Sequence, residues 1–236
     1  MKTYYFNIQS KGGAGKSMLT YLQALKHEQD DKALFVDLDS STKTSVRQLK
    51  FIGLRKRVVE VDIFDRLRKI ERERLFQVLE SLNKTPYERI YVDFGAPESE
   101  QLPGLFSIDF SIDEFKAFEQ ELGSAFRFNV VMAGGTAYRS CFEYLKKLTA
   151  AVDGRFPMVV YVNEFTFQHY EHLIEEVRQF AAATEGLIES VKPFGSIQAD
   201  RNSGQVITEN IREGRGLSDY QSFAAKTIIR RELAKV

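Results

Sequence analysis

The stretch Ser10-Lys11-Gly12-Gly13-Ala14-Gly15-Lys16-Ser17 decides how the rest of this chain is interpreted. Residues 4–9, before it, are aromatic and β-favouring, and residues 15–28, after it, carry apolar side chains at helical spacing. A strand, a glycine-rich turn and a helix form the setting in which backbone N–H groups and a helix N-terminus converge on phosphate oxygens. The sequence therefore predicts a phosphate-binding loop, and the alternative is a glycine-rich turn that binds nothing.

Two side chains at the end of this loop suit nucleotide chemistry. Lys16 can reach the β- and γ-phosphates, and the hydroxyl of Ser17 can ligate Mg²⁺. The general motif has glycine at its first position, where this chain has Ser10, and a second lysine, Lys11, stands at the loop entrance. The loop is thus a variant of the general motif, with one additional cation.

Composition limits the classes of protein that need to be considered. The chain has 236 residues, of which 43% are hydrophobic, and no repeat or low-complexity linker divides it. We therefore expect residues 1–236 to form a single domain. Lys and Arg number 33 and so do Asp and Glu, so the molecule as a whole has no strong attraction to nucleic acid or membranes. A local charged patch is compatible with this balance.

The cysteine count and the hydropathy indicate the compartment. One cysteine, Cys141, excludes a disulfide within the chain and favours a cytoplasmic location, and it is expected as a buried thiol in an apolar helix. No segment approaches ~18 continuous apolar residues, so no transmembrane segment is expected. The N-terminus enters a strand directly and lacks the apolar core of a signal peptide.

Six apolar runs of strand length, mostly separated by helical patterns, predict the fold class. They lie at about residues 4–9, 33–39, 88–94, 128–133, 158–163 and 191–197. This alternation predicts an α/β fold with a doubly wound, mostly parallel sheet flanked by helices. We further expect helices at about residues 136–151, 203–213 and 218–234, and one or two amphipathic helices within 62–83.

Carboxylate side chains stand at the ends of two of these strands. Asp37 and Asp39 occupy alternate positions at the end of one strand and project to the same side, and Asp93 ends the next strand. Open α/β sheets bind ligands at the carboxyl ends of their strands. The alternative is that these carboxylates cap the turns and helices that follow, together with Ser40 and Ser41.

The pattern K-G-G-x-G-K-S, with Lys11, resembles the deviant Walker A loop of the ParA/MinD family of ATPases, and the Asp37-Leu38-Asp39 and Asp93 segments resemble its other motifs. The chain looks like a small partition-type member without a helix-turn-helix extension. The resemblance implies a P-loop NTPase fold, ATP and Mg²⁺ as ligands, and a nucleotide-sandwich homodimer in which Lys11 reaches the partner's phosphates. The chain departs from the family at Ser40-Ser41, where partition ATPases usually have Pro-Gln.

The resemblance also assigns roles to the residues that match its motifs. Asp39 positions the attacking water, Asp37 supports the metal–water network, and Asp93 holds Mg²⁺ through a water. Asn163 resembles the family's base-reading asparagine, and because Asn163-Glu164-Phe165 lacks the guanine-reading N-K-x-D pattern, ATP is favoured over GTP. As an alternative, Asn163 satisfies only backbone groups of its turn. The catalytic set is then Lys11, Lys16 and Asp39; the nucleotide-binding set is Gly12, Gly13, Ala14, Gly15, Lys16, Ser17, Met18 and Asn163; the metal set is Ser17, Asp37, Asp39 and Asp93.

The function implied is that of an ATP-dependent switch in the partition of plasmids or chromosomes, or in the positioning of a cargo, reset by slow, partner-stimulated ATP hydrolysis. Its partners would be a second copy of the chain, a ParB-like activator or cargo adaptor, and nonspecific DNA bound through basic patches, which would add nucleoid association to a cytoplasmic location. Alternatives are an accessory ATPase of plasmid conjugation or stability, a dethiobiotin-synthetase-like ATP-dependent ligase, and a nucleotide-dependent module that does not hydrolyse ATP.

Four further segments carry charge or possible ligands. The basic cluster in residues 43–57 is interpreted as a solvated face, with binding to phosphate backbones as the alternative. The acidic segment 98–121 is interpreted as mainly core, with a partner surface as the alternative, and Ser111 with Glu114 forms a capping box there. His169 and His172 are expected on a half-exposed helix face rather than in a metal site. The C-terminal helix carries Lys226, Arg230, Arg231 and Lys235.

Overall fold

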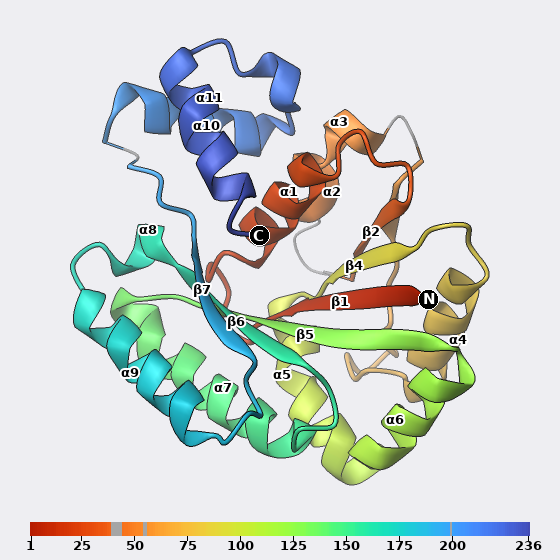
Figure 1. The fold of residues 1–236 in the computed structure, drawn as a ribbon. Helices are drawn as coiled ribbons and strands as arrows, with labels where there is room; N and C mark the ends of the chain where they lie inside the picture. The colour runs from red at the N-terminus through yellow and green to blue at the C-terminus, as the bar shows by residue number, and fades with distance from the viewer. Residues whose placement is uncertain (39–43, 54–55, 199) are drawn as a thin grey trace.

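A computed structural model describes residues 1–38, 44–53, 56–198 and 200–236 of the chain. Seven strands form one sheet in the order β3-β2-β4-β1-β5-β6-β7, and every neighbouring pair is parallel (Figure 1). The strands are β1 (Lys2–Ile8), β2 (Ala33–Asp37), β3 (Val58–Glu60), β4 (Arg89–Asp93), β5 (Ser124–Met132), β6 (Met158–Asn163) and β7 (Ser190–Phe194). The predicted doubly wound, parallel α/β sheet is confirmed.

Helices cover both faces of this sheet. Figure 1 shows α1, α2, α3, α10 and α11 on one side and α4, α5, α6, α7 and α9 on the other. Their bounds are α1 (Lys16–Lys26), α2 (Thr44–Gln48), α3 (Lys50–Gly53), α4 (Arg72–Asn83), α5 (Ala96–Gly104), α6 (Ile112–Glu121), α7 (Tyr138–Val152), α8 (Glu164–Phe167), α9 (Glu171–Ala183), α10 (Asn202–Glu213) and α11 (Phe223–Leu233), with a π-helical turn at Leu105–Asp109 and 3₁₀ turns at Gly135–Ala137 and Leu217–Asp219. None of the helices described is long and apolar enough to span a bilayer.

The central strands are nearly continuous apolar runs because helices bury them from both sides. Phe6, Phe126 and Phe115 form the centre of an aromatic cluster, with ring centroids 5.3 Å apart between the first two and 5.1 Å between the last two. Aromatic rings at these separations add to the free energy of burial. The strands that carry the predicted site residues therefore start from a rigid core.

The acidic segment 98–121 contributes to this core, as predicted. Phe106, Phe110 and Phe115 are buried, but Ile108 is 84% exposed, so the core interpretation is wrong for that residue. The predicted capping box is confirmed, because the Glu114 amide donates to Ser111 Oγ at 3.2 Å and the Ser111 amide donates to the Glu114 carboxylate at 2.6 Å. These contacts fix the start of α6.

Two segments differ from the sequence-based prediction. The strand β3 was not predicted, because three residues at the sheet edge carry too short a pattern to detect. Helix α4 begins only at Arg72, so a helix before that residue was a wrong prediction. The Asp65 carboxylate accepts the amides of Leu67 and Lys69 at 2.8 and 2.9 Å, and Phe64 bridges to Ile70. Such side-chain-to-backbone bonds compete with helix formation.

The predicted C-terminal helix is also shorter than expected. Ser222 caps α11 by accepting the amide of Ala225 at 3.4 Å, so the helix starts at Phe223 rather than at residue 218. A 3₁₀ turn occupies part of the remaining segment.

The two histidines considered above as metal ligands, His169 and His172, are both exposed. Only His172 lies on a helix, and His169 lies in the turn before it.

The basic cluster in residues 43–57 divides into two kinds of side chain. Lys50 and Lys56 are exposed, in agreement with the predicted solvated face, whereas Arg57 is only 1% exposed. Its guanidinium donates to the carbonyl oxygens of His27 at 2.9 Å, Glu28 at 2.6 Å and Asp30 at 2.7 Å. Arg57 thus satisfies carbonyl groups at the C-terminal end of α1, and the solvated-face interpretation was wrong for it. Lys43 and Arg55 lie outside the described residues.

Candidate functional site

The predicted phosphate-binding loop joins β1 to α1 at the carboxyl edge of the sheet. Gly13 and Gly15 have φ of +75° and +109°, in the left-handed region that favours glycine. Gly15 immediately precedes α1, whose first residue is Lys16. Lys11, Gly12 and Gly13 are exposed, while Ala14 is buried. The first half of the loop is therefore exposed to solvent, and its end, at Ala14, is packed against the protein.

Lys16 crosses the base of the loop. Its ammonium donates to the carbonyl oxygen of Gln9 at 2.8 Å, and the residue is only 8% exposed. Gln9 itself is fixed by three elements: its side-chain amide donates to Val131 O at 2.7 Å, its backbone amide donates to Ser99 Oγ at 3.2 Å, and its Oε1 accepts the Lys11 amide at 3.3 Å. The Lys16 ammonium is thus held at the loop, where it can form charge-assisted hydrogen bonds with phosphate oxygens.

A buried polar network under α1 was missed by the sequence analysis. Asn7 in β1 donates to Thr20 Oγ1 at 2.8 Å and Gln23 Oε1 at 2.7 Å, and accepts from Asn129 Nδ2 at 2.9 Å. All four residues are buried. The signal for it was a polar residue inside an apolar strand, followed by Thr20 and Gln23 at i, i+3 spacing. The network fixes α1, and with it the loop, against β1 and β5.

The strand-end carboxylates align as predicted. Asp37 of β2 is in register with Asp93 of β4, and Asp93 is in register with Asn7 of β1. Both carboxylate residues are 1% exposed. Asp37 Oδ2 also accepts the backbone amide of Val46, in α2, at 3.1 Å. This contact is of the kind that the helix-capping alternative predicts for Asp37. Asp39 lies outside the described residues, as do Ser40 and Ser41.

The chemistry of the donors can be tested against the predicted Mg²⁺. Ser17, Asp37 and Asp93 offer hard oxygen atoms, which Mg²⁺ prefers. Among the residues described, no group of three or more His, Cys, Asp or Glu side chains forms a site for a metal ion. Mg²⁺ is usually bound through one or two carboxylates together with substrate phosphates and waters, so the donor set fits an ion that arrives with a nucleotide.

Asn163 ends β6 and contacts the loop directly. It is 3% exposed, and its Nδ2 donates to the carbonyl oxygen of Ala14 at 3.0 Å. A Cβ atom at Gly15 would lie 2.4 Å from that nitrogen, so only glycine fits at this position. Over the described part of the chain, Asn163 Oδ1 has no hydrogen-bond partner. The side chain thus satisfies a backbone group of the loop rather than of its own turn.

Comparison with solved structures identifies this architecture. The MinC:MinD cell division protein complex of Aquifex aeolicus contains a chain that aligns with a TM-score of 0.53 at 11% identity, over 99% of this chain and 95% of that one. The chain has a ParA/MinD-like fold. Alignments were also obtained with the MinD cell division protein of Aquifex aeolicus (TM-score 0.49, 14% identity, 100% and 98% covered) and a ParA family ATPase of Chlorobium tepidum TLS (0.48, 16%, 99% and 99%). No protein-family model and no curated protein sequence matches the chain.

At these identities the likeness establishes the ParA/MinD-like fold alone. The resemblance based on Lys11, the Asp37 segment and Asp93 is therefore confirmed at the level of fold. The roles given to individual residues stay predictions, and their positions are those described above.

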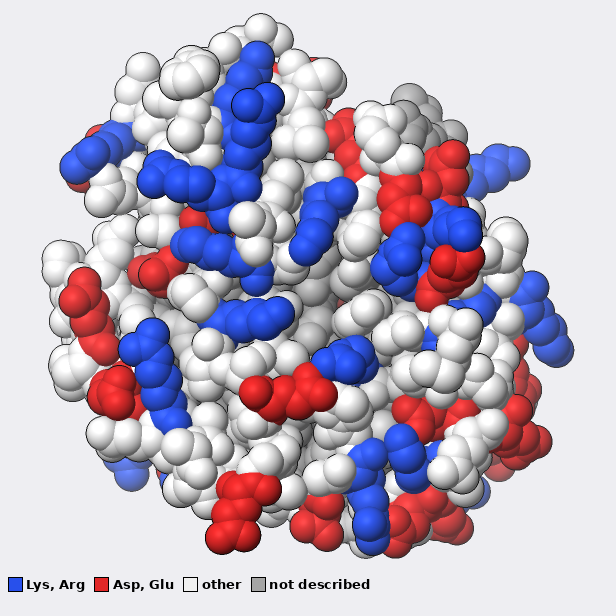
Figure 2. Space-filling view, viewed as in Figure 1, with Lys and Arg blue, Asp and Glu red and all other residues white. Residues whose placement is uncertain are grey.

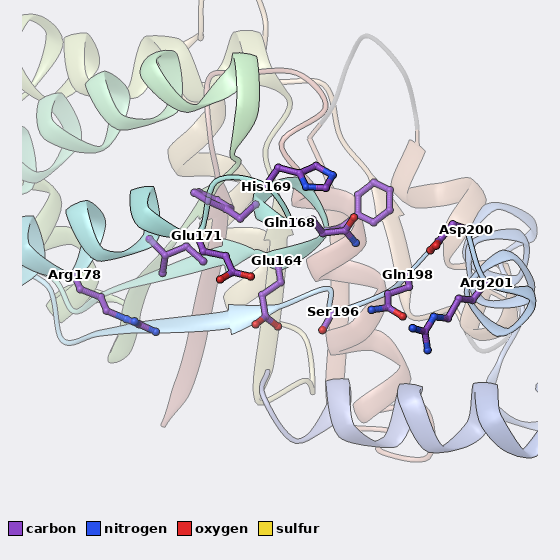
Figure 3. A pocket seen from close by; sticks show the side chains of 12 residues that line it. Glu164, Gln168, His169, Glu171, Arg178, Ser196, Gln198, Asp200 and Arg201 are labelled. Atoms are coloured by element: carbon purple, nitrogen blue, oxygen red, sulfur yellow. The ribbon is translucent and has the colours of Figure 1, made fainter.

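A cavity of about 850 Å³ lies beside Glu164, the residue that follows Asn163, in this ParA/MinD-like fold. Glu164, Gln168 and His169 line it from one side, and Gln198 and Arg201 from the segment after β7 (Figure 3). Its lining mixes both signs of charge with amide groups.

Cys141 lies in α7, behind the loop. The thiol is buried, as predicted, and Gln9 Nε2 approaches its backbone carbonyl oxygen at 3.4 Å. Burial raises the pKa of the Cys141 thiol, so the thiolate that would act as a nucleophile is disfavoured. The residue therefore acts in packing.

Proposed function

We propose that this protein is a Mg²⁺-dependent ATPase that works as a dimeric switch. The observation that carries the proposal is the position of Lys16, which is held across a glycine loop at the sheet edge where Asp37 and Asp93 stand in register. A buried, oriented cation and two carboxylates at one strand edge suit the binding and transfer of a phosphoryl group. The ParA/MinD-like fold agrees with this chemistry.

The proposed roles follow the geometry of the loop. Lys16 neutralises charge on the terminal phosphates, and Mg²⁺, when bound with the nucleotide, adds further charge neutralisation. Ser17, Asp37 and Asp93 hold the ion, and Asp39 orients the attacking water. Asn163 is proposed to contact the base, and its Oδ1 without a partner suits the amino group of adenine rather than the carbonyl oxygen of guanine.

Dimerisation is proposed to complete the site. Lys11 is exposed at the loop entrance, unlike Lys16, which serves its own loop. In the proposal, Lys11 enters the site of a second copy only when ATP is bound, so that the nucleotide selects one assembly state. Slow hydrolysis, stimulated by a protein partner, then returns the chain to its other state.

The proposed process is partition or positioning of a plasmid, chromosome or protein cargo, in the cytoplasm and at the nucleoid. Figure 2 shows Lys and Arg side chains gathered over the α10–α11 end of the molecule, which supports an anionic partner such as DNA. Arg230 and Arg231 of α11 are exposed there. Lys235, which was grouped with them, instead binds Glu164 and Glu232. A ParB-like activator or cargo adaptor is the proposed protein partner.

The direct test is ATP binding and turnover by the wild-type chain and by Lys16→Ala. Lys84→Ala, an exposed lysine at the end of α4, is the matched control. We expect turnover by the wild type and by Lys84→Ala, and a loss of about 100-fold or more in Lys16→Ala, as for removal of a group that stabilises transition-state charge. Normal turnover by Lys16→Ala would remove the phosphate-loop assignment.

A further inference from the structure

A carboxylate buried in the C-terminal helix contacts the segment that follows β7. Glu232 of α11 is 2% exposed. Its Oε2 accepts the backbone amide of Gly195 at 2.6 Å, and its Oε1 accepts the ammonium of Lys235 at 2.8 Å. A buried carboxylate needs such partners, because an unpaired charge in the interior is costly. Glu232 thus fixes Gly195 from a helix about 40 residues further along the chain.

Gly195 in turn lies against the predicted base-side residues. Its φ is +75°, and a Cβ atom there would lie 2.8 Å from Asn163 Oδ1 and 3.1 Å from Met18 Cε. The backbone at Gly195 therefore passes so close to the end of β6 and the first turn of α1 that a side chain at this position would clash with both. A shift of Gly195 would change the environment of both side chains.

Asn163 carries the contact on to the loop. Its amide donates to Ala14 O at 3.0 Å, and its Nδ2 is so close to Gly15 that no side chain fits between them. A continuous path of close approaches thus leads from α11 to the phosphate-binding loop. It passes in order through Glu232, Gly195, Asn163 and Ala14.

A second tie follows the same route. Lys235 Nζ lies 2.7 Å from Glu164 Oε2, next to Asn163, as well as 2.8 Å from Glu232. Burial opposes the charge on this lysine, but the hydrogen bonds that its ammonium donates to both carboxylates outweigh burial and raise the pKa of Lys235. Glu164 also lines the cavity of about 850 Å³ (Figure 3). Glu232 and Lys235 therefore attach α11 and the residues that follow it to both Gly195 and Glu164.

We infer that Glu232 is a positioning residue for nucleotide binding, which holds Gly195 against Asn163 and so couples α11 to the phosphate-binding loop. The inference rests on the proposed function, because it requires that the loop binds ATP. The exposed face of α11, with Phe223, Arg230 and Arg231, is thereby linked to the nucleotide site. A partner that binds α11 changes nucleotide affinity, and the nucleotide changes the affinity for that partner by the same factor.

The test measures binding of fluorescent N-methylanthraniloyl derivatives of ATP and GTP to the full chain, by anisotropy at a temperature well below the onset of unfolding. Four proteins are compared: wild type, Glu232→Ala, Glu232→Gln and Glu209→Ala, an exposed glutamate of α10. We expect Glu232→Ala to bind the ATP derivative about tenfold more weakly, equal to ~1.4 kcal/mol. Glu232→Gln keeps an oxygen that can accept the Gly195 amide, so its affinity should stay within about threefold of the wild type. Glu209→Ala should match the wild type.

A second readout separates positioning from simple loss of stability. The ratio of the GTP to the ATP dissociation constant should fall in Glu232→Ala, because Asn163 loses its fixed neighbour, whereas destabilisation alone leaves that ratio unchanged. The inference is overturned if Glu232→Ala has the same affinity for the ATP derivative and the same ratio of dissociation constants as Glu209→Ala. It is also overturned if Glu232→Gln loses as much affinity as Glu232→Ala does. If Glu232→Ala does not fold, Gly195→Ala is tested in its place. Nucleotide binding by Gly195→Ala equal to that of the wild type then overturns the inference. Absence of binding by the wild type rejects the proposed function itself.

Discussion

Asp37 and Asp93 stand directly opposite each other in register at the carboxyl ends of β2 and β4. Both are 1% exposed, and they lie at the sheet edge that also carries the glycine loop. Carboxylate oxygens are the ligands that Mg²⁺ prefers, and one or two of them usually bind the ion together with phosphates and waters. The proposed metal site at this edge leads to the first prediction.

Asp93→Asn should reduce Mg²⁺-dependent ATP turnover by about 10–100-fold, because outer ligands of a metal site typically contribute that much. The change is nearly isosteric, so folding and nucleotide binding without metal should persist. Turnover is measured by phosphate release at several Mg²⁺ concentrations. Asp109→Asn, at an exposed aspartate, is the control. Equal rates for the two variants would contradict a metal role for Asp93.

Lys11→Ala should abolish ATP-dependent dimerisation while the loop still binds nucleotide. The reason is that Lys11 is exposed and Lys16 already serves the loop of its own chain. Molar mass is measured by light scattering after size-exclusion chromatography, with and without ATP. Lys84→Ala should behave as the wild type does. A dimer of Lys11→Ala in ATP would show that this lysine does not act across the interface.

Asn7→Ala should lower the free energy of unfolding by about 3 kcal/mol, since it removes a hydrogen-bond partner from several buried polar groups, at about 1–3 kcal/mol for each group. The groups affected are the side chains of Thr20, Gln23 and Asn129. Urea denaturation followed by circular dichroism gives the value, and Asn202→Ala, exposed at the start of α10, is the control. A difference below about 0.5 kcal/mol from the control would mean that the network does not stabilise the fold.

The sequence allowed the sheet and the polar strand ends to be predicted because both depend on local pattern. Apolar runs mark buried parallel strands, and Asp37, Asp93 and Asn163 each follow such a run. The glycine loop could be found because its residue types are required at fixed spacing. Residues 58–60 escaped detection, since a short edge strand is defined by its pairing with β2 rather than by its own pattern.

The long-range contacts could not be predicted, for a different reason. Arg57 and Glu232 are of residue types that usually lie at the surface. Arg57 is buried because it binds the carbonyl oxygens at the end of α1, and Glu232 is buried because it binds the amide of Gly195. Nothing in the neighbouring sequence marks either role. Arg57 thereby holds the C-terminal end of α1, and Glu232 holds the segment that follows β7.

His27 should make the stability depend on pH. Burial lowers the pKa of His27 below its ordinary value of 6.5, although the hydrogen bond to Asp30 acts in the opposite direction. The unfolded chain therefore binds more protons than the folded chain near and below pH 6.5, and stability should fall as the pH drops from 7.5 to 5.5.

The measurement is the urea midpoint at each pH for wild type and His27→Gln. The slope between pH 7.5 and 5.5 should be smaller in His27→Gln. Asp30, whose pKa is lowered from 3.8 by the Lys32 amide and Arg89 despite burial, loses its contribution only at more acidic pH, so the two windows are separate. His172→Gln, at an exposed histidine, is the control. Parallel curves for all three proteins would assign the pH dependence to other groups.

Binding to DNA, if α11 supplies the surface, should depend steeply on salt. Each phosphate contact contributes a slope of about −0.9 to a plot of log affinity against log salt concentration. Replacing the exposed Arg230 and Arg231 together by Ala should therefore reduce the slope by about 2 and weaken binding at low salt. The measurement is anisotropy of a labelled duplex of arbitrary sequence with ATP and Mg²⁺. As a control, Arg74→Ala combined with Lys84→Ala, in and just after α4, removes the same charge elsewhere. An unchanged slope in the α11 variant, with wild-type binding intact, would place the DNA surface on another element. No binding by the wild type even at low salt would point to a protein or membrane scaffold as the positioning surface.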